Sequence, residues 1–174
     1  MQLRPYLPRF FAALLLAALA GCASSSYTGA GLRAGASEAD VRATMGQPYA
    51  VHKAPPGADY AQSLEYPHGP GGRQTYMARL DAGGKLIRVE QVLQERTLVK
   101  IRVGVDNMQS ISDLLGRPGQ YTGPNRMYGG ATWDYFANEM QRHIIISVSF
   151  DRNGVVAAAG SMDDPMDFVP SGSM

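Results

Sequence analysis

Few residues in this chain have the types and spacing that chemistry requires. The three histidines, His52, His68 and His143, lie in separate segments, and none shows the i, i+4 pairing of a helical zinc site. The sequence lacks a G-x-S-x-G motif, the turn that carries the nucleophilic serine of many hydrolases. Cys22 is the only cysteine, which excludes an internal disulfide and a multi-cysteine metal site. We predict that the protein is not an enzyme and uses no metal or cofactor.

The position of Cys22 explains why the chain has a single cysteine. Residues 10–20 read FFAALLLAALA, and two arginines but no acidic residue precede them. A membrane-spanning helix needs about 20 apolar residues, so this shorter run is typical of a signal peptide. Leu19-Ala20-Gly21-Cys22 then resembles the lipobox of bacterial lipoproteins. The resemblance implies cleavage before Cys22 and lipidation of it, whereas an uncleaved anchor or a buried free cysteine fits the short run less well.

The resemblance to lipoproteins also implies a location. Ala23 follows the cysteine, where an aspartate would be the usual signal for retention in the inner membrane. We therefore expect a protein that is lipid-anchored to the outer membrane and faces the periplasm. The net charge of +1, without a basic stripe, argues against nucleic-acid binding.

The mature chain contains an internal repeat of about 70 residues. Three blocks recur in the same order: VRATMGQP with ISDLLGRP, SLEY with TWDY, and LDAGGKL with FDRNGVV. The first block predicts a helix that ends at Gly46 or Gly116, in the left-handed conformation, before a proline. For the helix starts we expect caps formed by Ser37 with Asp40 and by Asp106 with Gln109.

The second and third blocks predict strands. Leu64 and Tyr66, like Trp133 and Tyr135, alternate with polar residues and would share one face of a sheet. Asn153-Gly154 suits a tight type I′ hairpin turn. Each repeat is thus predicted to be a short helical segment packed on a three-stranded antiparallel sheet. A short helix around Leu98 and Ile101 would precede the second capped helix, and the fold class would be α+β.

These boundaries divide the chain into five segments. We expect a helical signal peptide at 1–21, a flexible tether at 22–36, a first repeat at 37–93, a second repeat at 94–163 and a disordered tail at 164–174.

The combined pattern resembles the SmpA/OmlA family, whose fold is that of BamE. The resemblance lies in the lipobox, in the run from Gly104 to Pro118 with its counterpart from Gly35 to Pro48, and in the aromatic strand and hairpin ending at Val155. It implies a non-enzymatic module that binds proteins in outer-membrane protein assembly or cell-envelope integrity. The partner would be the assembly machinery or another envelope protein.

Two copies of the unit are also similar to the tandem fold of secreted β-lactamase inhibitor proteins. That similarity implies an alternative function, in which the chain caps a periplasmic or surface enzyme.

A sheet covered by helices on one face leaves its other face for a partner. The alternation of the hairpin strands predicts which side chains this open face carries. The candidate partner face consists of Met77, Arg79, His143, Ile145 and Ser147, flanked by Thr75 and Ser149. An ordinary solvated sheet face is the alternative. Glu65 and Asp134 occupy equivalent outward positions, and the repeat explains this carboxylate pair better than acid–base catalysis does.

Overall fold

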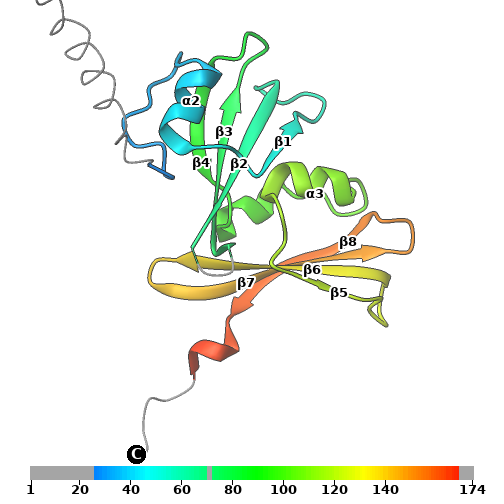
Figure 1. Ribbon diagram of the computed structural model, residues 1–174. Helices are drawn as coiled ribbons and strands as arrows, with labels where there is room; N and C mark the ends of the chain where they lie inside the picture. Colours follow the sequence, from blue (N-terminus) through cyan, green and yellow to red (C-terminus); the bar gives the residue numbers. More distant parts are fainter. Residues whose placement is uncertain (1–25, 70–71, 169–174) are drawn as a thin grey trace, which may run out of the picture.

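The structure is a computed structural model that describes residues 26–69 and 72–168. Within these residues the chain forms two four-stranded antiparallel sheets, one from each sequence repeat (Figure 1). The predicted signal peptide, the lipidation site Cys22 and residues 169–174 lie outside the described residues. In the part of the chain that the structure covers, no helix is long and apolar enough to cross a bilayer.

The two repeats have the same order of elements. In the first repeat these are α2 (Glu38–Met45), β1 (Ala50–Lys53), β2 (Gln62–His68), β3 (Gln74–Leu80) and β4 (Leu86–Gln91). In the second they are η3 (Glu95–Lys100), α3 (Met108–Leu115), β5 (Gln120–Thr122), β6 (Gly129–Glu139), β7 (Arg142–Asp151), β8 (Val156–Asp163) and η4 (Pro165–Phe168). We call β1 to β4 sheet 1 and β5 to β8 sheet 2; the strands of each lie in sequence order. The α+β prediction is confirmed.

The prediction of three strands per repeat is wrong, because each sheet has a fourth strand at one edge. The additional strands are β1 and β5, which pair with β2 and β6 directly after the helix and its proline. They contain only four and three residues. Strands this short show no alternation that could separate them from a loop in the sequence.

Both helices begin and end at equivalent residues. Ser37 caps α2 with Asp40, as predicted, and Asn107 caps α3 with Ser110, one residue later than the predicted Asp106. The side chain of Asp106 instead binds Arg102. Both helices stop before a glycine with positive φ. The ψ values of Gly46 and Gly116 are −166° and −153°. They lie outside the predicted left-handed region, in a conformation that is essentially confined to glycine.

The predicted type I′ turn at Asn153-Gly154 is wrong, because only Gly154 has positive φ there. The Asp151 carboxylate instead accepts the backbone N–H groups of Asn153 and Val155, and Asp81 makes the same contacts in the first repeat. An aspartate and a later glycine therefore define a three-residue hairpin turn with a bulge. A two-residue turn with positive φ at both positions does occur, at Met140 and Gln141 between β6 and β7.

Parts of the predicted tether and tail are folded. Ser26 N–H donates to the carbonyl of Thr44 at 2.8 Å, and Leu32 packs on the core of the first repeat. At the other end, Asp164 is buried and accepts a hydrogen bond from Arg73 at 2.8 Å. Residues 26–36 and Asp164 therefore belong to the folded unit.

The elements stack as four layers: α2, sheet 1, α3 and sheet 2 (Figure 1). Helix α2 covers one face of sheet 1 around Val41, Leu64 and Leu80. Helix α3 lies between the two sheets, and its apolar side packs on sheet 2 around Ile111 and Phe150. Each sheet therefore has an inner face packed on its own helix. We call the opposite face of each sheet its outer face.

Candidate functional site

Helix α3 covers the outer face of sheet 1. Met77 is fully buried and Arg79 is only 2% exposed, so the prediction that these two residues lie on an open face is wrong. The reason is tertiary: Met77 belongs to the core of the second repeat, together with Ile111 and Leu115 of α3. A single helix thus packs on its own sheet and on the sheet of the other repeat.

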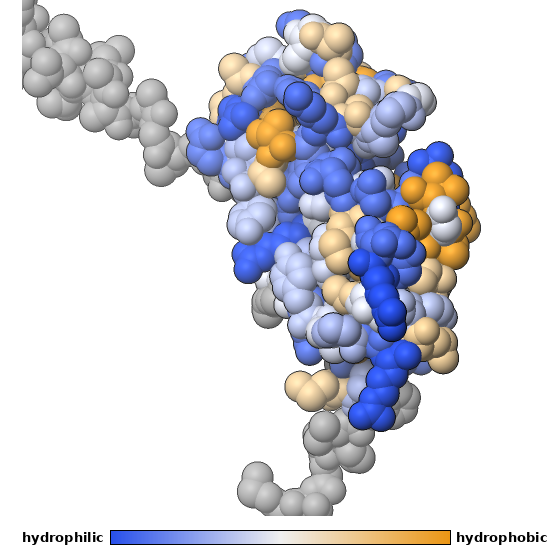
Figure 2. Space-filling model, turned by 90° about the vertical axis from the view of Figure 1, so that its right-hand side faces the viewer, coloured by the Kyte–Doolittle hydropathy of each residue, from blue (hydrophilic) through white to orange (hydrophobic). Residues whose placement is uncertain are grey.

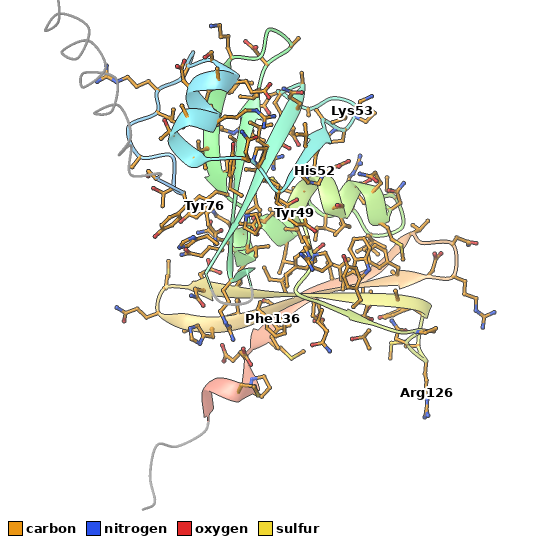
Figure 3. All side chains as sticks on the ribbon, in the orientation of Figure 1. Tyr49, His52, Lys53, Tyr76, Arg126 and Phe136 are labelled. Atoms are coloured by element: carbon orange, nitrogen blue, oxygen red, sulfur yellow. The ribbon has the colours of Figure 1, made fainter. Side chains whose placement is uncertain are left out.

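His52 of β1 lies at the centre of this junction, close to α3 (Figure 3). Its Nε2 is 2.7 Å from a carboxylate oxygen of Glu65, and its Nδ1 is 3.0 Å from one of Asp113. Both ring nitrogens face acceptors, which a histidine satisfies only as the imidazolium with two N–H donors. The hydrogen bond with Glu65 raises the pKa of His52 above its usual value, although burial opposes the shift. We assign a positive charge to this buried side chain.

Glu65 also binds the end of α3. Its second carboxylate oxygen accepts the backbone N–H of Arg117 at 2.8 Å. Gly116 lies so close that a Cβ atom there would be 2.7 Å from the same oxygen. Position 116 therefore requires a glycine for two reasons: its φ of 80° and its close contact with Glu65. Sequence reasoning identified only the first requirement.

Arg79 is the second buried cation of the junction. Its guanidinium donates to Ser63 Oγ at 3.0 Å, to Tyr60 Oη at 3.1 Å and to the carbonyl of Asp113 at 3.3 Å. It also pairs with Glu90 at 3.3 Å. Because these contacts join β2, β3, β4 and α3, they fix the helix on sheet 1. We call His52, Glu65, Arg79 and Asp113 the junction cluster.

The geometry of the junction cluster indicates a structural role. Glu65 and Asp113 contact opposite nitrogens of His52 and so do not converge on one point, and no group of metal ligands occurs within the described ranges. Glu65 is 1% exposed, whereas its repeat counterpart Asp134 lies on the outer face of sheet 2. The structure therefore does not bring these two carboxylates together as an acid–base pair.

A cleft of about 520 Å³ opens beside the junction, between the loop after β1 and the start of α3. Its charged walls are mostly paired: Arg88 binds both Asp59 and Glu90, and Arg102 binds Asp106. The hydrogen bonds with Asp59 and Glu90 raise the pKa of Arg88. These pairs hold the loop against sheet 1. The side of the molecule in Figure 2 is mostly hydrophilic, with hydrophobic residues in small separate groups.

The other predicted site residues share the outer face of sheet 2. His143, Ile145 and Ser147 alternate along β7 with fully buried residues and are themselves half-exposed. Phe136 of β6 and Met162 of β8 flank Ile145 in the strand register. Phe136 lies on the side of the sheet away from α3 (Figure 3). The structure therefore separates the predicted face into a buried part on sheet 1 and an open, partly apolar part on sheet 2.

The junction cluster was missed by the sequence analysis. His52 and Asp113 are separated by 61 positions and lie in different repeats, so no local spacing connects them. The one available signal was a difference between repeats. Ala43 and Thr122 stand where the other repeat has Asp113 and His52, so both polar partners are specific to the junction.

Comparison with known proteins gives one match. Residues 90–160 match the model of the outer membrane protein assembly factor BamE domain. The comparisons with curated proteins and with solved structures gave no match. The matched range covers less than half of the chain, from the end of β4 through most of β8, and it excludes the rest of the first repeat. Its description suggests a role in outer-membrane protein assembly. The second repeat of this chain thus matches the BamE domain over most of its length, and a first repeat of the same element order precedes it.

Proposed function

We propose that the chain is an outer-membrane lipoprotein that binds proteins, without catalysis, during the assembly of outer-membrane proteins. The observation that carries this proposal is the BamE domain at residues 90–160. The signal peptide and lipobox of the sequence support the anchor, and the open face of sheet 2 supplies a surface for a partner.

The partner surface in this proposal is the outer face of sheet 2. Ile145, Phe136 and Met162 form its apolar part, and Met162 is 58% exposed. Half-exposed polar residues, among them His143 and Ser147, surround them. An apolar centre within a polar rim is the usual composition of a protein–protein contact. Sheet 1 has no comparable surface, because α3 already covers its outer face.

Site-specific photocrosslinking tests the partner surface. A photoreactive amino acid at Ile145 of the full chain, in intact cells, is expected to give adducts with an envelope protein. The same amino acid at Val99, which is 87% exposed on η3, is the control and should give few adducts. Equal labelling from the two positions, or none from Ile145, would contradict the proposed surface.

Substitution of the lipidation site tests the anchor. Cys22→Ala removes the only thiol of the chain, so acyl labelling should disappear and the protein should move from the membrane to the soluble fraction. Metabolic labelling with a fatty acid and membrane fractionation measure the two effects. Unchanged fractionation of the variant would refute the lipid anchor.

A further inference from the structure

The two ends of the four-layer stack are equivalent to the two surfaces that meet inside it, where α3 contacts the outer face of sheet 1. Within the molecule, the side of α3 that points away from sheet 2 binds the outer face of sheet 1. At one end, the equivalent side of α2 is open, since Ala39 and Ala43 are exposed. At the other end, the outer face of sheet 2 is open. The chain thus carries a second helix side and a second sheet face of the same kind.

One hydrogen bond of the internal contact has an equivalent donor at one end of the stack and an equivalent acceptor at the other. Inside, the Glu65 carboxylate accepts the N–H of Arg117, the residue after the glycine that ends α3. Asp134 is the equivalent carboxylate in sheet 2, and within the described residues it accepts only the Ser147 hydroxyl, at 2.6 Å. Gln47 is equivalent to Arg117, and its backbone N–H makes no hydrogen bond in the described part of the chain. An acceptor at one end matches a donor at the other.

The glycine at the end of each helix shows the same relation. A Cβ atom on Gly116 would clash with Glu65 and lie 3.1 Å from Met77. A Cβ atom on Gly46 would have no atom of the described residues within 4 Å. The end of α2 therefore has room for a sheet face such as the one that α3 contacts.

The charged groups of the internal contact between α3 and sheet 1 are mostly replaced at the two open surfaces. In the internal contact, Asp113 of α3 meets His52 and Arg79 of sheet 1. At the ends, alanine replaces the aspartate, and Thr122 and Ser149 replace the two cations. The Asp113 anion and its two cations are thus absent together. Asp134 is the carboxylate that remains in the contact, where the Ser147 hydroxyl and the Gln47 N–H would be its hydrogen-bond donors.

We propose that α2 of one copy docks on the outer face of sheet 2 of a second copy, in the way that α3 docks on sheet 1. This inference rests on the proposed role of that face as a protein-binding surface and names its occupant. The two surfaces in contact are different, so the association is head-to-tail and does not close at a dimer. The last copy in such a row keeps a free sheet face for another envelope protein.

Crosslinking between two differently tagged full chains tests this proposal in intact cells. One chain carries a photoreactive amino acid at Gln120, at the rim of the outer face and opposite Asp134 in the strand register. We expect an adduct that contains both tags and joins Gln120 to a peptide from residues 38–49. Ala43→Arg in the second chain places a large charge in the contact and should lower the adduct yield at least about tenfold. Ala82→Arg, in the exposed turn after β3, is the matched control and should leave the yield unchanged.

The outcomes distinguish this inference from the proposed function. Adducts from Gln120 and Ile145 with another envelope protein, and never with the second tag, would overturn head-to-tail docking and keep the binding face. A two-tag adduct through a peptide outside 38–49, or one that survives Ala43→Arg, would also overturn it. The absence of every adduct from both positions would contradict the binding face and its occupant together.

Discussion

The two repeats share their elements and differ in what covers their sheets. Helix caps, glycine stops, hairpin turns and four-stranded order are equivalent in both. Sheet 1 is covered on both faces, by α2 and α3, whereas the outer face of sheet 2 is open. The difference shows how two copies of one small unit form a single body. Helix α3 has a polar side that carries Asp113, and sheet 1 carries the buried His52 and Arg79 that bind Asp113.

The same difference separates structural from functional roles. Residues on the outer face of sheet 1 join the two repeats and are therefore inaccessible to a partner protein. The equivalent positions on sheet 2 remain accessible, and this face belongs to the repeat that matches the BamE domain. We infer that the first repeat extends and stabilises the unit, while the second presents the binding surface.

The largest expected difference between the repeats concerns His52. His52→Ala leaves the carboxylates of Glu65 and Asp113 buried without their cation, and loss of one partner of a buried ion pair costs about 3–5 kcal/mol. Thr122→Ala at the exposed equivalent position should change the free energy of unfolding by less than about 0.5 kcal/mol. Chemical denaturation measures both values. Similar effects of the two substitutions would show that His52 does not hold the junction.

A smaller difference is expected at the glycines that end the helices. Gly46→Ala forces a side chain into a glycine-only conformation, at a cost of about 1–3 kcal/mol. Gly116→Ala carries the same strain and also displaces Glu65, so we expect a further cost of about 1–3 kcal/mol. The comparison uses melting curves of the two variants. An equal loss at both positions would mean that Gly116 can move away from sheet 1 freely.

The smallest expected effect is a pH dependence that arises from His52 in the junction. The pKa of His52 is raised in the folded protein, so its contribution to stability is complete below the unfolded value of about 6.5. That contribution is lost as the pH rises through the higher folded-state pKa. The melting temperature of the native chain should therefore fall over this range relative to His52→Gln, which has no charge to lose. Parallel pH profiles of the two proteins would exclude a charged His52.

Local sequence patterns predicted the two helices and the longer strands, because such patterns depend only on neighbouring residues. The Gly-x-Pro stops after α2 and α3 and the strand alternation around Leu64 and Tyr135 were visible at short range. The repeat also established that the chain contains two similar units. The short edge strands β1 and β5 escaped detection, because three or four residues are too few for a periodic signal.

Only the tertiary structure decided which predicted outer face is available. Met77 and Ile145 both read as outward residues of alternating strands, and nothing near either in sequence separates them. One is buried because α3, more than 30 positions later, packs across its strand, while no described element covers the other in the same way. The sequence alone determined the two α+β units and their helix stops, and it carries the prediction of a lipobox at Cys22. Their stacking depends on contacts between distant residues, such as His52 with Asp113, which form only when both repeats are folded.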